Sequence, residues 1–138
     1  MSSYIKIRFG NEFEHQEYTS DKTLDEMFHS INPMFRMGAV TWKPQVDIFE
    51  TVTDIVVQAT MAGVDKENLQ IEISNKAIKI SGMRAGHPQD VKATYRLAEI
   101  QYGTFERVLF LPCNIDTDKV SAVYENGFLQ VSLAKLSE

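Results

Sequence analysis

From Trp42 onward, apolar and polar residues alternate in short runs that are separated by turn residues. This period of two places every second side chain on the same face, which is typical of β-strands with one buried face. The pattern predicts seven strands, whose apolar positions are Val46 and Ile48, then Ile55, Val57, Ala59 and Met61, then Leu69, Ile71 and Ile73, then Ile78 and Ile80, then Val108 and Phe110, then Val120, Ala122 and Tyr124, and finally Val131 and Leu133. Because no helical pattern of about ten residues or more lies between these runs, the chain predicts an all-β sandwich rather than βαβ units.

The predicted strands are joined by two short hairpin candidates and one long connection. Asn126-Gly127 supplies the residues that most readily adopt the two positive φ angles of a type I′ turn. Asn75-Lys76 is a weaker candidate, because Lys tolerates positive φ poorly. The segment Gly82–Gly103 is irregular apart from a weak extended pattern around Thr94–Leu97. A loop of this length in a compact domain is usually functional or disordered.

The first 41 residues follow a different pattern and predict a partly helical N-terminal arm. Between Thr23 and Phe35 the apolar residues are spaced at three and four, as on one face of a helix. These residues are Leu24, Met27, Phe28, Ile31 and Phe35. Half of the aromatic residues of the chain lie in residues 1–42. An arm this apolar must pack on the sandwich, on another subunit or on a partner.

Composition and charge narrow the possible functions. The chain has 138 residues, of which 24% are charged and 43% hydrophobic, values that fit one ordered domain. A net charge of −5 argues against nucleic-acid binding, because that affinity depends on clustered Lys and Arg. No run of about eighteen apolar residues occurs, so we expect no membrane span. We expect a cytoplasmic protein, and the single cysteine, Cys113, fits a reducing compartment.

The residues that could carry catalysis are few and scattered. The three histidines, His15, His29 and His87, have no second His or Cys at metal-ligand spacing. Cys113 follows a proline at a strand end, where a structural thiol is the better interpretation. No phosphate-binding glycine motif or nucleophile elbow occurs. We therefore expect neither an enzyme nor a cofactor or metal.

Several motifs, in order, resemble the small heat-shock proteins. The segment around Tyr102-Gly103-Thr104-Phe105-Glu106-Arg107, which continues to Leu111-Pro112, resembles the Y-G-x-F-x-R…L-P block of that family. Ala122–Leu129 is similar to its A-x-x-x-N-G-x-L signature. Upstream, Pro44–Thr51, Ala62-Gly63-Val64 and Ile78–Arg84 follow the family pattern in the same order. The resemblance implies an α-crystallin domain, an immunoglobulin-like β-sandwich, over residues 42–135, preceded by an arm at 1–41 and followed by a truncated or very short tail at 136–138.

The resemblance also implies a function. Small heat-shock proteins are ATP-independent chaperones that hold partly unfolded clients and prevent their aggregation under stress. We expect this chain to bind such clients and to self-associate as a dimer or a larger homo-oligomer. The alternative from another class is a co-chaperone or interaction module that resembles a CS domain. Residues 134–138 contain no I-x-I or I-x-V motif, so the resemblance does not extend to assembly through the tail.

Three sets of candidate site residues follow from the same resemblance. The predicted dimer interface pairs an extended segment of the long loop with an edge strand of a neighbour: Thr94, Tyr95, Arg96, Leu97 and Ala98 with Val46 and Ile48. The predicted edge groove, which would accept an I-x-I peptide, is lined by Leu69, Ile71, Ile73, Val120, Ala122 and Tyr124. Clients are expected on the arm, at Leu24, Met27, Phe28, Ile31 and Phe35.

Overall fold

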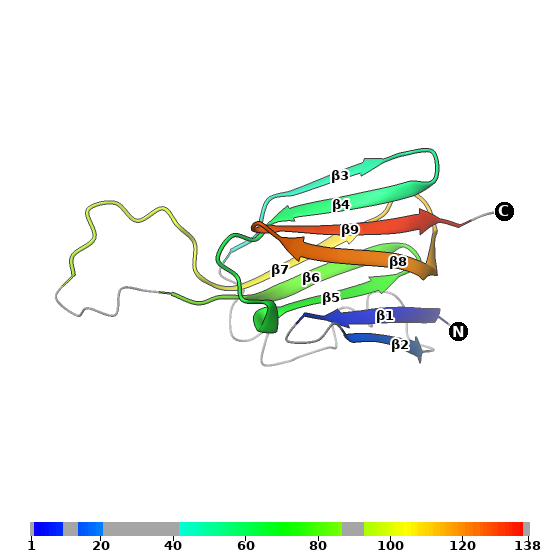
Figure 1. The fold of residues 1–138 in the computed structure, drawn as a ribbon, viewed down its shortest axis with the longest axis horizontal. Helices are drawn as coiled ribbons and strands as arrows, with labels where there is room; N and C mark the ends of the chain where they lie inside the picture. The colour runs from blue at the N-terminus through cyan, green and yellow to red at the C-terminus, as the bar shows by residue number, and fades with distance from the viewer. Residues whose placement is uncertain (1, 10–13, 21–41, 87–92, 137–138) are drawn as a thin grey trace.

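Two antiparallel sheets pack face to face in the computed structural model, which describes residues 2–9, 14–20, 42–86 and 93–136 (Figure 1). The larger sheet has the strand order β2 (Glu14–Ser20), β1 (Ser2–Arg8), β5 (Leu69–Ser74), β6 (Ala77–Arg84) and β7 (Gly103–Phe110). The smaller sheet has the order β3 (Val46–Glu50), β4 (Asp54–Thr60), β9 (Phe128–Lys135) and β8 (Ile115–Glu125). One short 3-10 turn, η1 (Lys66–Asn68), precedes β5. The predicted all-β sandwich is therefore confirmed.

The seven strands that the alternating pattern predicts are β3 to β9, and most of their predicted apolar positions contribute to the core. Strand β7 is the exception: Phe105 and Leu109 face the core, whereas Phe110 is 64% exposed, so the prediction that Val108 and Phe110 form the buried face is wrong. The inward-facing side chains of the two sheets meet between the layers and are fully or almost fully buried: Ile55, Val57 and Ala59 from β4, Leu69, Ile71 and Ile73 from β5, Ile78 and Ile80 from β6, Phe105 from β7, and Leu129, Val131 and Leu133 from β9. Burying one large aliphatic side chain stabilises the fold by about 1.5–3 kcal/mol. This alternation also fixes the register, because a slip by one residue would turn every apolar side chain to solvent.

The two predicted hairpins form by different means. Asn126 and Gly127 both have positive φ, 54° and 81°, as a type I′ turn requires. The Asn75-Lys76 turn instead uses a side chain, because the Ser74 hydroxyl accepts hydrogen bonds from the backbone N–H groups of Lys76 and Ala77, at 3.4 and 3.1 Å. The Ser74 hydroxyl therefore stabilises this turn, in which neither Asn75 nor Lys76 adopts a positive φ.

The N-terminal segment contains two strands that the sequence pattern did not predict. Strands β1 and β2 pair with each other, and β1 also pairs with β5, with Ile5 opposite Ile73 and Ile7 opposite Ile71. Ile5, Ile7 and Phe9 are buried and belong to the core. Strands β1 and β2 of the arm therefore belong to the larger sheet, where the sequence pattern predicted no strand. The helix expected between 23 and 35 lies outside the described residues.

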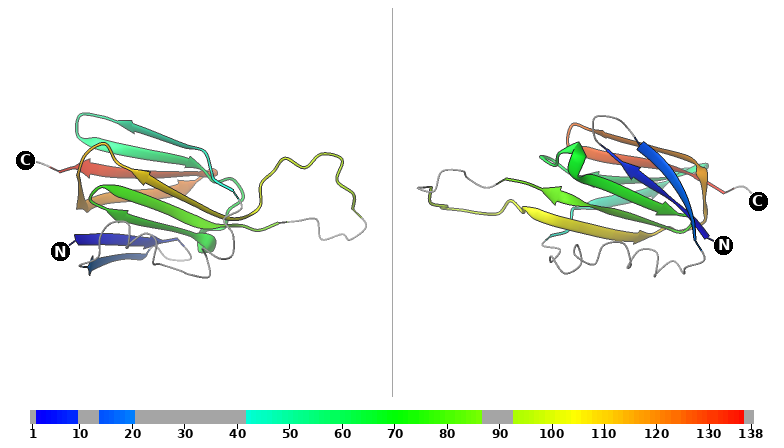
Figure 2. Two further views of the ribbon diagram at one scale, coloured as in Figure 1. Left: turned by 180° about the vertical axis from the view of Figure 1, so that it is seen from behind. Right: turned by 90° about the horizontal axis from the view of Figure 1, so that it is seen from below.

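The long connection after β6 leaves the sandwich and returns to β7. Figures 1 and 2 show its described parts projecting beyond the end of both sheets. Residues 93–101 are exposed, and within the described part of the loop no strand forms. The predicted irregular segment is therefore confirmed as a projecting loop, although β6 continues to Arg84 before the chain leaves the sheet.

Gly82 provides a test of the packing between β6 and the turn before β5. A Cβ at this position would lie 2.0 Å from the Asn68 carbonyl oxygen and 2.8 Å from Cζ of Phe105. Both neighbours are fixed by the sandwich, so Gly82→Ala should lower the free energy of unfolding by roughly 3 kcal/mol or more. Urea unfolding followed by circular dichroism measures this change. Ala85→Ser, three residues on at an exposed position, should change stability by less than about 0.5 kcal/mol; an equal loss in both variants would contradict the steric explanation.

Candidate functional site: an edge groove and a projecting loop

The residues predicted to line an edge groove come together where β5 faces β8. Leu69, Ile71 and Ile73 of β5 are fully buried between the sheets. On β8, the edge strand of the smaller sheet, the remaining predicted residues are partly buried and pack against the same core: Val120, Ala122 and Tyr124. The two sets therefore face each other across the sandwich, and most of their surface is core rather than exposed groove.

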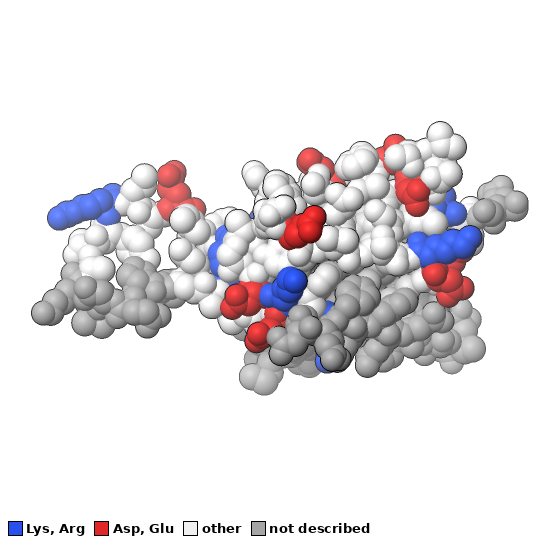
Figure 3. Space-filling model, viewed as in Figure 1, with Lys and Arg blue, Asp and Glu red and all other residues white. Residues whose placement is uncertain are grey.

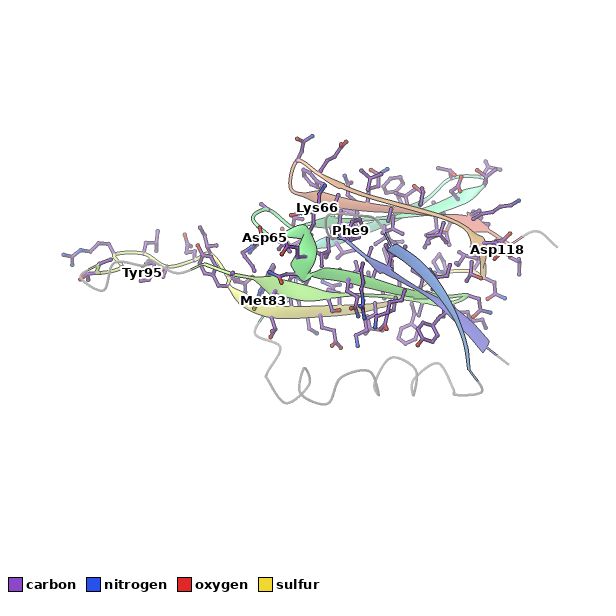
Figure 4. All side chains as sticks on the ribbon, turned by 60° about the horizontal axis from the view of Figure 1, so that its bottom comes forward. Phe9, Asp65, Lys66, Met83, Tyr95 and Asp118 are labelled. Carbon is purple, nitrogen blue, oxygen red and sulfur yellow. The ribbon has the colours of Figure 1, made fainter. Side chains whose placement is uncertain are left out.

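Strand β1 of the same chain covers the edge of this groove. Ile5 and Ile7 lie opposite Ile73 and Ile71, and the N–H of Phe9 donates to the carbonyl of Leu69 at 3.4 Å. The Phe9 ring packs edge-on against the ring of Tyr124, with 6.5 Å between centroids. Figure 4 shows Phe9 at the end of β1, between the two sheets. The groove is thus filled in this structure, where an open groove was expected.

The sequence pattern did not lead to a prediction of strand β1, although the alternation of apolar and polar residues typical of a strand is present there. Ile5-Lys6-Ile7 is itself an I-x-I sequence, and together with Phe9 it continues the period of two. The resemblance to the family places such a motif in the tail rather than at the N-terminus. Alternation over five residues at the N-terminus would have predicted a strand, but not which edge it covers.

A row of alternating charges crosses the larger sheet on the face turned away from the core. Lys6, Glu72 and Lys79 are directly opposite one another on β1, β5 and β6. The Lys6 ammonium lies 4.0 Å from Glu72, and the Lys79 ammonium lies 3.6 Å from Glu106 on β7. Glu72 is only 2% exposed and Lys79 only 5%. Among the described residues, no hydrogen-bond donor reaches Oε2 of Glu72.

Burial is the largest cause of the pKa shifts of Glu72 and Lys6. It raises the pKa of Glu72, and the nearby Lys79 and Lys6 only partly oppose that effect. Burial also lowers the pKa of Lys6, while Glu72 acts in the opposite direction. Both shifts have the same cause, because each charged form loses hydration that its neighbours do not fully replace.

Tyr124 connects β8 to the turn that follows β4. Its hydroxyl lies 2.6 Å from the carbonyl oxygen of Met61 and 2.7 Å from that of Val64, and its single proton is donated to one of them at a time. Burial raises the pKa of this phenol, and the hydrogen bond to Val64 acts in the opposite direction. The Met61 N–H donates to the Gly127 carbonyl at 2.6 Å, so the Asn126-Gly127 hairpin is bound to the same turn.

The two limbs of the projecting loop are joined at their base by Arg84. Its Nε donates to the Ala62 carbonyl and its Nη1 to the Gln101 carbonyl, both at 2.8 Å. The guanidinium also lies 4.2 Å from the ring centroid of Trp42, a cation–π distance. Trp42 packs on Phe105 and donates from Nε1 to the Gly103 carbonyl at 3.0 Å. The loop therefore leaves a fixed base.

The predicted dimer residues lie in two separate places within one chain. Residues 94–98 are all exposed on the loop, and Figure 4 shows Tyr95 far from the sandwich. Val46 and Ile48 lie on β3, an edge strand of the smaller sheet that pairs on one side with β4 and with no other described strand. Ile48 is 39% exposed although its cross-strand partner Val57 is buried. A single chain does not bring the loop and β3 together.

The remaining predictions can be placed only in part. The proposed client residues on the arm lie outside the described residues. Within the described ranges, no group of three or more His, Cys, Asp and Glu side chains is arranged for a metal ion. No helix in that part of the chain is long and apolar enough to cross a membrane. On the face shown in Figure 3, the described acidic and basic side chains are interspersed.

Comparisons with known proteins identify the family. The sequence model of the Hsp20/alpha crystallin family matches residues 47–138. Small heat shock protein C2 of Rickettsia felis is 30% identical over 118 residues, which cover 83% of this chain and 76% of that protein. The 17.8 kDa class I heat shock protein of Arabidopsis thaliana is 36% identical over 95 residues, covering 68% of this chain and 60% of that protein. Heat shock protein 16.0 of Schizosaccharomyces pombe has a similar structure, with a TM-score of 0.63 at 29% identity over 69% of this chain and 88% of that chain.

Fold and sequence therefore agree, and the chain belongs to the Hsp20/alpha crystallin family of small heat-shock proteins. Proteins of this family are ATP-independent chaperones rather than enzymes. The strands that carry the match, β3 to β9, are those that the alternating pattern predicts. Strands β1 and β2 lie before the residues that the family model matches.

The raised pKa of Glu72 predicts a specific pH dependence. As the pH rises above about 4.3, the ordinary pKa of a Glu side chain, Glu72 ionises in the unfolded chain while it is still protonated in the native state. The free energy of unfolding therefore falls with pH until Glu72 also ionises in the native state. Glu72→Gln removes this titration. The free energy of unfolding of the variant minus that of the wild type should therefore rise with pH from about 4.3 and then become constant. Urea unfolding at a series of pH values, with the exposed Glu67→Gln as matched control, measures it; a difference that falls with pH would show that the lysines outweigh burial.

Proposed function

We propose that this protein is a holdase, which binds partly unfolded proteins under stress and keeps them from aggregating without nucleotide. The observation that carries the proposal is the sandwich matched to the small heat-shock proteins over residues 47–138. Within that fold the described residues offer exposed apolar side chains rather than a catalytic constellation. They include Tyr95, Leu97, Ile100, Phe110 and Phe128.

The physical basis is the burial of apolar surface. A protein that begins to unfold exposes apolar side chains, and covering them is favourable by about 25 cal/mol for each Å². Contacts of this kind are not directional, so one surface accepts many sequences. We expect the principal client surface on the arm, at Met27, Phe28 and Ile31 with their neighbours, because methionine and aromatic side chains adapt to varied partners.

The proposed assembly unit is a dimer formed by strand addition. The free edge of β3 carries backbone groups that no other described strand of this chain pairs. The loop segment 94–98 carries apolar side chains with little cover in one chain, with Leu97 74% and Tyr95 55% exposed. Adding this segment of one copy to β3 of another would satisfy both features. The base formed by Arg84 and Trp42 supports the proposal, because a loop whose two ends are anchored has less conformational entropy to lose on docking.

The holdase proposal predicts that the purified protein alone suppresses the aggregation of a heated client. Suppression measured by light scattering should be the same with and without ATP. Replacing Phe28, Ile31 and Phe35 by Ser should abolish most of it, while the melting temperature and the oligomer mass stay unchanged. Truncation of residues 1–41 is not an equivalent test, because it also removes Ile5 and Ile7 from the core. A chain that acts only when a dedicated chaperone is added would favour the CS-domain-like alternative instead.

The dimer proposal predicts a change of mass when the loop loses its apolar side chains. Tyr95→Ser combined with Leu97→Ser should convert dimers to monomers, because strand addition then buries little apolar surface. Size exclusion with multi-angle light scattering measures the mass, and the melting temperature should hold. Val52→Ser is the matched control, because Val52 is 93% exposed and lies in the turn between β3 and β4, outside the proposed contact. An unchanged mass in the double variant would contradict the proposal.

A further inference from the structure

The buried polar and charged side chains of the described part of the chain all lie on one surface, the outer face of the larger sheet. They are Glu72 and Ser74 of β5 and Lys79 and Ser81 of β6, none of them more than 8% exposed. Their sequence neighbours are core isoleucines, so these four side chains point away from the core. Water normally reaches the outer face of an antiparallel sheet. No described strand or helix lies over this face, so another part of the chain or a partner covers it.

The smaller sheet shows what an outer face without such a cover looks like. Ser132 on β9 is comparable to Ser81, because each lies on an inner strand and points away from the core. Ser132 is partly exposed, whereas Ser81 is buried. The large apolar side chains on the outer face of the larger sheet stay accessible, with Met83 39% and Phe110 64% exposed. The cover therefore lies over the polar centre of this face rather than over its apolar ends.

The connection between the two edges of the larger sheet identifies a covering segment. Strand β2, at one edge, ends at Ser20. The next described residue, Trp42, pairs with Phe105 beside β7, at the other edge. Residues 21–41 therefore join one edge of this sheet to the other. Because the smaller sheet fills the inner face, the direct route crosses the outer face.

The length of the segment suits this route. Four strand spacings separate β2 from β7, or about 19 Å. Ser20 is level with the Ser74 end of β5 and Phe105 with its Leu69 end, so the path runs diagonally over roughly 30–35 Å. The 21 residues span about 32 Å even as a continuous α-helix, a compact regular form. Residues 21–41 can thus cross the face without being stretched.

The chemistry of the face favours a polar cover. Glu72, Lys79 and Glu106 alternate in sign across it, and the Lys79 ammonium lies 3.6 Å from Glu106. Oε2 of Glu72 and Oε2 of Glu106 are buried and accept no hydrogen bond from any described residue. An apolar cover would leave these carboxylate oxygens without donors, at a considerable cost in free energy. The face therefore fits a segment that brings N–H or O–H donors.

Residues 21–41 contain such a polar side. At helical spacing, Lys22, Glu26 and His29 share the side opposite the apolar stripe, which consists of Leu24, Met27, Phe28, Ile31 and Phe35. Lys22 and His29 carry N–H donors that suit a carboxylate, and Glu26 between them suits an ammonium group. The alternation of the segment thus complements the alternation of the face.

We propose that the outer face of the larger sheet is a docking surface for residues 21–41 of the same chain, which lay their polar side on the charges and turn the apolar stripe outward. Two observations carry the inference: the concentration of buried polar side chains on this face, and the two edges that the segment joins. The docking stands without the holdase activity. Its consequence rests on that proposed function, because the sheet would then present the stripe to clients as a fixed surface.

Thiol accessibility tests whether this segment is the cover. In a Cys113→Ser background, Ser81→Cys should react with a maleimide about tenfold more slowly than the matched Ser132→Cys. Replacing residues 22–36 by a Gly-Ser sequence of equal length leaves β1, β2 and Trp42 in place and should bring the two rates within about threefold. Circular dichroism verifies that the variant is folded. A Ser81→Cys thiol that stays protected after the replacement would overturn the proposal.

Photo-cross-linking identifies the occupant without altering the segment. In the same background, Met83→Cys carries a benzophenone maleimide on the outer face, two residues from Ser81. Unlabelled and ¹⁵N-labelled chains are refolded together and irradiated. Docking within one chain predicts that trypsin releases the peptide of residues 23–36 joined to that of residues 80–84, both with the same isotope. Pairs of mixed isotope would assign the cover to a second copy and overturn the proposal, as would cross-links to other peptides or none.

Two variants of unchanged length separate the two sides of the segment. Lys22→Ala together with His29→Ala removes the proposed donors and should speed the labelling of Ser81→Cys about tenfold, because hydrogen bonds to buried carboxylates are lost. The triple Ser variant of the apolar stripe should change this rate less than about twofold. The reverse result would overturn the orientation. Aggregation suppression is measured separately, so failure of the docking and failure of the holdase function remain distinguishable.

Discussion

The edges of the two sheets impose the constraint on which much of this structure depends. An edge strand presents unpaired N–H and C=O groups, and a sandwich of two open sheets has four such edges. The four edges of this sandwich differ in what lies beside them. β1 and β2 extend the larger sheet past β5, Trp42 pairs with Phe105 beside β7, and β3 and β8 bound the smaller sheet. The covered edges stabilise one chain, and the edge of β3 is where the proposed assembly begins.

The cover over β7 also organises the projecting loop. Arg107 donates to the Pro44 carbonyl at 3.0 Å, and this contact holds the segment that leads into β3 beside β7. Trp42 lies in the same segment and forms the surface on which the Arg84 guanidinium rests. The entry to the domain and the base of the loop are therefore one structural unit. A change at Trp42 would alter the cover of β7 and the direction of the loop together.

The cover over β5 combines apolar burial with an unusual polar requirement. Isoleucine side chains from β1 complete the core, while on the opposite face Lys6 lies close to a carboxyl group that is almost fully buried. Buried ion pairs contribute little net stability, because desolvation offsets the attraction between the charges. Their clearer effect is on which partner is accepted, since a wrong charge is strongly disfavoured. The contact between Lys6 and Glu72 therefore adds little net stability, and the buried isoleucines account for most of the stabilisation that β1 provides.

The sequence by itself determined the sandwich, because a period of two with one apolar face indicates the buried face of most strands, and Asn126-Gly127 fixes the hairpin between β8 and β9. In β7 the apolar run did not indicate the buried face, since Phe105 and Leu109 rather than Phe110 turn to the core. The sequence also indicated the projecting loop, since Gly82–Gly103 contains no sustained alternation of apolar and polar residues. Which edge each segment covers was decided only by the tertiary structure. Ile5-Lys6-Ile7 has the alternation of a strand, but its place on β5 rests on contacts with Ile71 and Ile73, residues more than sixty positions away. Alternation along a chain records which side chains are buried, whereas the pairing of edges depends on contacts between segments that only the folded chain brings together.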